Sequence, residues 1–252
     1  MQKTPSLSSF FLRNLAMILM LIDHTGLVFF PNHIWIRAIG RLAFPIFAFL
    51  LVQGFLYTHD LRSYIGRLLA MAILTDIPYH LMSEGKLAYS PFQNVLWTFV
   101  IALISLASID YLKKLEKKWA LLPILLVLLI ACSLADYLGT DYASRGVAMV
   151  HVFYFFQGQS LKNKSWQLFF FFIINVIMKN FPLIQEYGWE AVYQSWQIYG
   201  LEIISIQYWA LTALPIIWLY SGQQGYKSKI SQSFSYLFYP LHMLLLALIK
   251  VL

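Results

Sequence analysis

Apolar runs long enough to cross a lipid bilayer follow one another along this whole chain, and they limit its possible folds more than any other feature. Hydrophobic residues make up 60% of the 252 residues and charged residues only 12%, so little of the chain can form an aqueous surface. A transmembrane helix needs about 20 consecutive, mostly apolar residues. Continuous apolar runs, rather than alternating ones, favour helices over a barrel. We therefore predict an all-α, polytopic protein of the cell membrane, with one domain over residues 1–252.

The apolar runs predict about nine transmembrane helices, with the N-terminus inside and the C-terminus outside. The spans are residues 9–30, 34–57, 64–82, 93–112, 119–138, 146–161, 165–181, 201–220 and 234–252. This orientation places 12 of the 18 basic residues on the inner side: Lys3, Arg13, Arg62, Arg67, Lys113, Lys114, Lys117, Lys118, Lys162, Lys164, Lys227 and Lys229. Cytoplasmic loops carry such an excess of Lys and Arg. The net charge of +7 thus reflects orientation and does not indicate a nucleic-acid partner.

An Asp-His pair, Asp23 and His24, interrupts the first apolar run. A charged side chain at the bilayer centre costs about 2.5–3.5 kcal/mol on insertion scales, so intramembrane charges tend to be paired and functional. Histidine has an unperturbed pKa close to neutrality, which suits it to proton transfer. Adjacent helix positions point about 100° apart. Asp23 can therefore pair with His24 or with an arginine of the next span.

Other segments bring polar side chains to the outer half of the membrane. Arg37 and Arg41 have the i,i+4 spacing that places two side chains on one helix face. The remaining polar positions near the outer ends of predicted spans are Asp76, Tyr79, His80, Gln93, Asn94, Asp136, Asp141 and Arg145. Two interpretations stay open for this set: ion pairs that lock helices together, or a polar cavity open to the outer side.

Arg13 precedes His24 by eleven positions on the same predicted helix, a separation of about 16 Å. Arg13 would then lie at the cytoplasmic mouth, either as a functional cation or as an interfacial anchor.

His151 and His242 also lie within predicted spans, where a lone histidine is more often an interhelical hydrogen-bonding residue. No set of His and Cys residues has the spacing of a zinc site, so no metal is predicted.

Three segments resemble the TraX family, which is related to the acyltransferase-3 membrane proteins. They are AMILMLIDHTG at residues 16–26, IGRLAFPIFAFLLVQGF at residues 39–55 and YLFYPLH at residues 236–242. Acyltransferase-3 members carry a basic residue, ten intervening residues and then the catalytic histidine, and Arg13 and His24 match this pattern. The related proteins also use an RxxR pair, whereas Arg37 and Arg41 are one residue further apart.

The resemblance implies transfer of an acetyl or other acyl group from acetyl-CoA, as co-substrate, to a hydroxyl or amine beyond the membrane. The acceptor would be a glycan, a peptide amine such as a pilin N-terminus, or a lipid headgroup. His24 would be the general base, with Asp23, Arg37 and Arg41 orienting it or stabilising the oxyanion. The CoA phosphates would bind Arg13, Arg62 and Arg67, with the lysines of residues 113–118 near them. Asp76, Asn94, Asp141 and Arg145 would support this site.

Two other functions fit the same residues. Intramembrane Asp, His and Arg also suit a proton-coupled transporter, although the chain shows no inverted repeat. A non-enzymatic assembly factor for a surface or secretion complex would need none of the catalytic roles. The aromatic residues of 182–200 predict an outer connection that forms an interfacial belt or shapes acceptor access.

Overall fold

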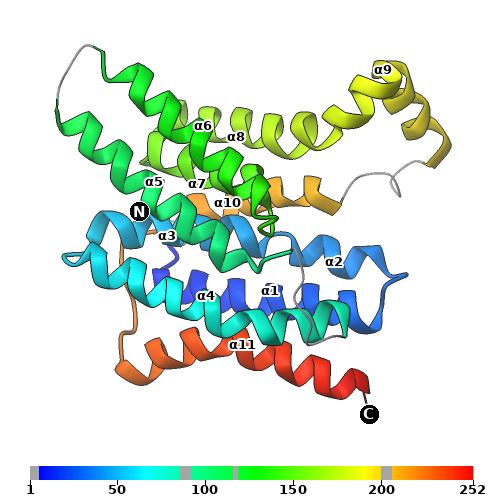
Figure 1. The fold of residues 1–252 in the computed structure, drawn as a ribbon, viewed down its shortest axis with the longest axis horizontal. Helices are drawn as coiled ribbons and strands as arrows, with labels where there is room; N and C mark the ends of the chain where they lie inside the picture. The colour runs from blue at the N-terminus through cyan, green and yellow to red at the C-terminus, as the bar shows by residue number, and fades with distance from the viewer. Residues whose placement is uncertain (1–5, 86–91, 116–118, 200–205, 252) are drawn as a thin grey trace, which may run out of the picture. The chain divides into compact units, whose positions relative to one another are not determined.

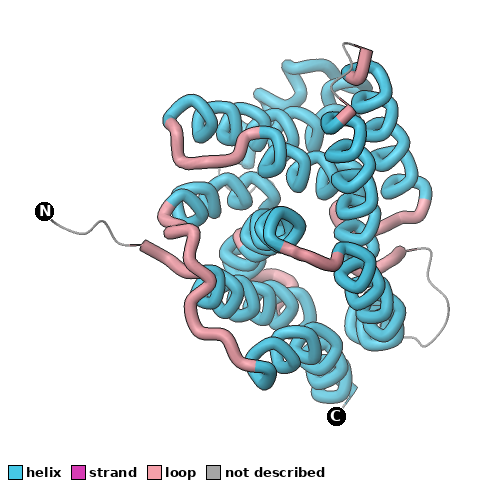
Figure 2. Tube along the Cα trace, turned by 90° about the vertical axis from the view of Figure 1, so that its left-hand side faces the viewer, coloured by secondary structure: helices cyan, strands magenta, loops and turns pink. Residues whose placement is uncertain are grey.

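Helices account for nearly all of the regular structure. The computed structural model describes residues 6–85, 92–115, 119–199 and 206–251, and within them it contains helices and two isolated β-bridges (Figures 1 and 2). The α-helices are α1 (Ser9–Phe29), α2 (Ile34–Gly40), α3 (Ala43–Tyr57), α4 (Leu61–Glu84), α5 (Val95–Lys114), α6 (Leu121–Tyr137), α7 (Ala143–Phe155), α8 (Leu161–Phe172), α9 (Met178–Tyr199), α10 (Ala213–Trp218) and α11 (Lys229–Val251). The predicted all-α class is confirmed.

The long apolar helices make this chain a multi-pass integral membrane protein. Four helices of the described residues are long and apolar enough to cross a membrane: Ser9–Phe29, Ile34–Tyr57, Val95–Lys114 and Ile230–Lys250. The helix pair Leu161–Phe181 and Ile184–Glu190, bent by 105°, makes a fifth if it counts as one span. The nine predicted spans are therefore not confirmed. Some predicted spans correspond to shorter apolar helices, and α4 is long enough but less apolar.

The contacts divide the chain into two compact units. The first unit is Met1–Phe47 with Phe156–Ser235, and the second is Ala48–Phe155 with Tyr236–Leu252. In the first unit, α1 packs against α2, and α2 contacts the 3₁₀-helix η3 (Ile206–Thr212). In the second unit, α5 packs against α4, α6 and α7. The organisation as one domain stays a prediction.

Buried amide side chains join the later helices of the first unit. Gln207 of η3 donates a 2.8 Å hydrogen bond to Asn175, which lies in the short π-helix η1 (Ile173–Ile177) that continues α8. Trp218 of α10 donates a 2.7 Å bond to Gln167 of α8. Such interhelical hydrogen bonds are the usual way in which membrane helices hold polar side chains. They fix α8 and η1 against η3 and α10.

Residues 182–199 of the segment predicted as an outer connection, residues 182–200, are helical. Helix α9 covers Met178–Tyr199, with a break at Gly188, whose φ of 74° and ψ of 175° lie outside the helical region. Glycine accepts this backbone conformation because it has no Cβ. The aromatic side chains of Tyr187, Trp189 and Tyr193 are exposed, so an interfacial role stays a prediction. Residue 200, the end of the predicted connection, lies outside the described residues.

Hydrogen bonds join segments that were predicted on the same side of the membrane, while the orientation itself stays a prediction. In the first unit, Leu7 and Ser221 pair through their backbones, and Gln159 donates to the Tyr220 carbonyl. These three segments were all predicted on the inner side. In the second unit, Gln93 pairs with the backbone of the turn at Gly139 and Asp141, and both segments were predicted on the outer side.

Candidate functional site

Helix α1 places Asp23 on its buried face. Leu12, Ala16, Leu19, Asp23 and Gly26 are all buried and recur at spacings of three and four residues. This spacing defines one stripe of a helix. Asp23 therefore occupies a position where a small or apolar residue would be expected. Its charge needs compensation inside the protein, because a buried carboxylate without a partner is strongly destabilising.

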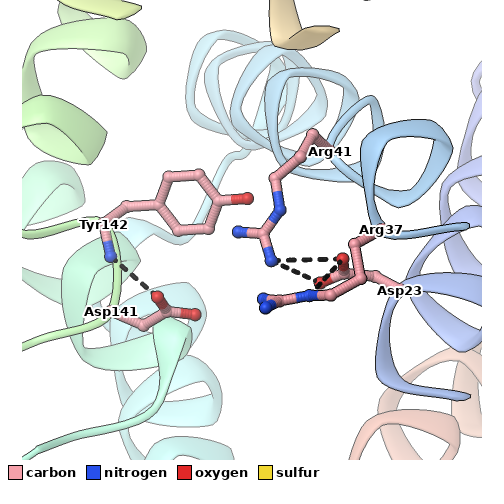
Figure 3. A network of polar contacts seen from close by, with 5 residues as sticks. All are labelled: Asp23, Arg37, Arg41, Asp141 and Tyr142. Atoms are coloured by element: carbon pink, nitrogen blue, oxygen red, sulfur yellow. Dashed lines mark hydrogen bonds and ion pairs between the residues drawn. The ribbon is translucent and has the colours of Figure 1, made fainter. Parts of the chain in front are cut away.

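Two arginines of the first unit provide that compensation. Nη2 of Arg41 donates to both Asp23 carboxylate oxygens, at 3.1 and 2.8 Å (Figure 3). Nε of Arg37 lies 3.6 Å from Oδ1 of Asp23. The Asp23 and Arg41 side chains are 13% and 12% exposed, and Arg37 is 27% exposed. The i,i+4 prediction of a shared face is confirmed, since both arginines reach one carboxylate. Of the alternatives that the sequence left open for Asp23, the structure shows the pairing with arginine.

Glycines allow α1 and α2 to approach closely enough for these contacts. A Cβ placed on Gly40 would lie 2.2 Å from Cβ and 2.6 Å from Cα of Asp23. A Cβ on Gly26 would lie 2.8 Å from Cγ2 of Ile36. Helices in membranes use small residues at such crossings for the same reason. Gly40 thus sets how closely α2 approaches the Asp23 backbone, and with it the positions of Arg37 and Arg41 relative to the Asp23 carboxylate.

Replacing Gly40 by alanine should destabilise the protein, because its methyl group would collide with the Asp23 backbone and not with a movable side-chain end. We expect a loss of at least about 2 kcal/mol, within the range for overpacking. The matched control is Gly66→Ala in α4, where a Cβ meets nothing within 4 Å. That variant should be neutral or stabilising by about 0.5–1 kcal/mol. Thermal unfolding in detergent measures both, and equal midpoints would contradict the close approach.

Arg13 and His24 lie on one face of α1. Eleven residues are three turns plus about 20°, so the two side chains point in nearly the same direction and are about 16 Å apart along the axis. Both side chains are half-buried. The guanidinium carbon of Arg13 lies 5.9 Å from the centre of the Phe10 ring, which holds the cation near the start of the helix. Asp23, one position before His24, points toward α2 instead.

The second unit contains its own polar group around the start of α5. The Asp76 carboxylate on α4 accepts hydrogen bonds from Asn94 and from the indole nitrogen of Trp97, the latter at 3.2 and 3.3 Å. Asn94 is fully buried; it also caps α5 through Leu96 and donates to the Ala72 carbonyl. Trp97 was missed by the sequence analysis. The sequence feature that could have identified Trp97 is its position three residues after Asn94, in the first turn of an apolar helix.

Asp141 and Arg145 belong to the same unit. Asp141 accepts a 3.0 Å hydrogen bond from the backbone of Tyr142 (Figure 3). The backbone carbonyl of Asp141 accepts a hydrogen bond from Thr98 of α5. Tyr142 and Ala143 have φ values of 65° and 49°. Consecutive non-glycine residues in this region are uncommon and mark a backbone held by its surroundings. Arg145 lies half-buried in the first turn of α7.

The other described basic residues predicted to bind CoA, Arg62, Arg67, Lys113 and Lys114, lie at helix ends of the second unit, and Lys117 and Lys118 lie outside the described residues. Arg62 and Arg67 are exposed in the first two turns of α4, after the capping residue Asp60. Hydrogen bonds from Ser63, and the nearby charge of Arg67, lower the pKa of Asp60. Lys114 forms a 2.6 Å ion pair with Asp110, and Nζ of Lys113 lies 4.8 Å from the centre of the Tyr154 ring.

The two other membrane histidines were predicted to make interhelical hydrogen bonds; His151 makes one, and the bond described for His242 stays within its own helix. Nε2 of His151 on α7 lies 3.0 Å from the hydroxyl of Ser105 on α5, which joins the two helices. Nδ1 of His242 lies 2.7 Å from the Phe238 carbonyl of its own helix, so this bond is not interhelical. Among the residues that the structure describes, no group of three or more His, Cys, Asp or Glu side chains could hold a metal ion.

The fold and the site define a multi-pass integral membrane protein with charged side chains buried among its helices. The chain belongs to the TraX family, whose model matches residues 8–250. It is 32% identical over 117 residues to the probable fimbrial assembly protein FimC, serogroup H1, of Dichelobacter nodosus, covering 42% of this chain and 48% of that protein. It is 28% identical over 150 residues to Protein TraX of Escherichia coli, covering 57% and 54%. These matches span about half the length of the curated relatives. No solved structure matches.

Proposed function

We propose that this protein is a membrane-embedded acyltransferase that moves an acetyl group from cytoplasmic acetyl-CoA to an amine or hydroxyl acceptor on the outer side. The observation that carries the proposal is the common face of Arg13 and His24 on α1. Their separation of about 16 Å is about half of a hydrocarbon core some 30 Å thick. Acetyl-CoA has charged phosphates at one end and a long arm that ends in a thioester. Its phosphates match the Arg13 cation at the cytoplasmic mouth, and its thioester matches the His24 imidazole inside the membrane.

His24 acts as the general base in this proposal. As the acceptor nitrogen or oxygen attacks the thioester carbonyl carbon, its proton passes to the neutral imidazole. The C–S bond then breaks, and the departing CoA sulfur takes the proton from the imidazolium. The acetyl group remains on the acceptor, so atoms and charge balance without a metal or a redox partner. General acid–base catalysis of this kind contributes about 10²–10⁴ to a rate.

The Asp23–Arg37–Arg41 group positions charge beside this histidine. The Asp23 carboxylate holds Arg41 through both oxygens and has Arg37 within 3.6 Å. Two guanidinium groups against one carboxylate leave a net positive charge at the α1–α2 crossing. Positive charge fixed before the reaction stabilises an oxyanion as it forms. We therefore assign Asp23 to positioning the arginines, and the arginines to stabilising the tetrahedral intermediate.

A peptide amine is the acceptor that the family membership favours. TraX proteins are associated with N-acetylation of pilin, and one curated relative is named as a fimbrial assembly protein. Both support an extracytoplasmic pilin-type N-terminus as the acceptor, in preference to a glycan or a lipid headgroup.

Replacing Arg13 by alanine should raise the apparent KM for acetyl-CoA about tenfold while leaving kcat within about twofold, because a phosphate contact made equally in the ground and transition states affects binding alone. Steady-state transfer with varied acetyl-CoA measures both constants. Lys250→Ala, which removes a cation at the other end of the chain, is the control and should leave KM unchanged. An unchanged KM in Arg13→Ala would make Arg13 an interfacial anchor only.

A second candidate function is a non-enzymatic factor in the assembly of a surface structure. The name of the Dichelobacter nodosus relative favours it. This function predicts that His24 is dispensable and that a stable protein partner co-purifies. Acetyl transfer by the purified protein alone separates the two candidates.

A further inference from the structure

The loop between α10 and α11 runs beside the start of α1 in the first unit. Leu7 and Ser9 donate backbone hydrogen bonds to the carbonyls of Leu219 and Gln223, at 2.8 and 2.9 Å, and Ser221 donates to the Leu7 carbonyl at 2.8 Å. Phe10 donates to the Gln224 carbonyl at 3.1 Å. The paired residues are 212 or more positions apart in the sequence. These backbone hydrogen bonds therefore hold the loop of residues 219–226 against the first turn of α1 (Figure 2).

Glycine keeps this loop in close contact with α1. Gly225 has a φ of 73°, and a Cβ there would lie 2.5 Å from Oγ and 2.7 Å from Cβ of Ser8. Ser8 is the capping residue of α1 and accepts from the Phe11 backbone. Gly222 also has a positive φ, of 77°. Both glycines thus permit a backbone path that other residues would strain.

This contact assembles a row of aromatic and cationic side chains. The Tyr226 and Phe10 rings meet edge to face, with centroids 5.5 Å apart and an interplanar angle of 75°. The Arg13 guanidinium lies 5.9 Å from the centre of the Phe10 ring. Tyr226 is 64% exposed, so much of its ring surface is open, and the neighbouring Lys227 is exposed as well. Phe10 therefore contacts both the Arg13 cation and the open Tyr226 ring, and the Lys227 cation follows Tyr226 in the chain.

We infer that this row binds the nucleotide part of the CoA substrate, with the adenine on Tyr226 and the phosphates on Arg13 and Lys227. The inference rests on the proposed function and adds a substrate-binding element to it. Aromatic rings stack on nucleobases, and Lys and Arg side chains bind phosphate. The position suits this role, because Arg13 is also the residue that shares a face of α1 with His24. The acyl arm would then run from this row along α1.

Binding of two probes tests the inference: CoA, and pantetheine, which lacks the nucleotide. For the full-length protein in nanodiscs, Tyr226→Ala should weaken CoA binding about tenfold, the usual effect of losing one stacked base. It should leave pantetheine binding unchanged. Tyr226→Phe keeps the ring and should bind CoA like the wild type. Tyr137→Ala removes a tyrosine that is 87% exposed on α6 and is the matched control.

Four results would overturn the inference. Unchanged CoA affinity in Tyr226→Ala would make Tyr226 an interfacial residue in contact with lipid. Equal losses for CoA and pantetheine would show a general disturbance of α1, and so would weak binding by Tyr226→Phe. If instead the wild-type protein binds CoA no better than pantetheine while it still transfers acetyl groups, the proposed function stands and only the nucleotide site is wrong. Failure of the wild type to transfer would contradict the proposed function itself.

Discussion

Replacement of His24 by alanine should reduce acetyl transfer at least about a hundredfold, because no other group on the same face of α1 as Arg13 is assigned to take the acceptor proton. The binding of CoA should be retained, since the nucleotide is held near the start of the helix and His24 acts about 16 Å away. Single-turnover transfer and equilibrium CoA binding, measured on the same preparation, separate the two effects. The fold should also be retained, because His24 is only half-buried.

A second histidine provides the control for this experiment. His59 is exposed between α3 and α4, so His59→Ala changes the same residue type at a position outside α1. It should leave transfer within about twofold of the wild type, a change of less than about 0.5 kcal/mol in activation free energy. A His24→Ala variant with wild-type turnover would remove the general-base role. It would then favour the assembly factor as the function.

Removal of the Asp23 carboxylate should be the most destabilising substitution at the α1–α2 crossing. Breaking a buried ion pair from one side costs about 3–5 kcal/mol, because the remaining charge loses its partner. Asp23→Ala leaves two guanidinium groups without their shared carboxylate. Arg41→Ala still leaves Arg37 within 3.6 Å of Asp23. We therefore expect Asp23→Ala to cost more than Arg41→Ala, and Arg41→Ala more than Arg37→Ala.

A double-mutant cycle isolates this interaction. The combined Asp23→Asn and Arg41→Gln variant removes both charges while keeping side chains of similar shape, so it should be more stable than Asp23→Asn alone. Equilibrium unfolding in mixed detergent gives the four free energies, and a coupling of about 1–3 kcal/mol is expected for groups in direct contact. Additive losses, with no coupling, would contradict the pairing of Asp23 with Arg41.

The local parts of the site could be predicted from sequence. The spacing of Arg37 and Arg41 fixes their shared face, and the eleven-residue interval fixes the relation of Arg13 to His24, because both follow from helix geometry alone. The partner of Asp23 could not be predicted in this way. It depends on how closely α1 and α2 approach, which Gly40 sets through a contact 17 positions away in the sequence.

Non-local contacts account for most of what the sequence did not reveal. The hydrogen bonds of Trp97 to Asp76 join two helices, and the pairing of residues 7–10 with residues 219–224 joins opposite ends of the chain. Neither of these two contacts follows from a periodic pattern in the sequence. Hydropathy predicted a helical membrane protein correctly, whereas its nine spans are not confirmed. Long helices, short helices and bent helices all give apolar runs, and only the backbone path distinguishes them.

The most direct measurement of the central claim is transfer of labelled acetyl groups by the purified protein in proteoliposomes. Acetyl-CoA is supplied on the side of residues 7–10 and 219–226, and a peptide with a free pilin-type N-terminal amine is supplied on the opposite side. The proposed function predicts acetylation of that amine across the bilayer by the wild type, none when acetyl-CoA is omitted, and at least about a hundredfold less by His24→Ala. An unmodified peptide in the presence of correctly folded, CoA-bound protein would contradict it.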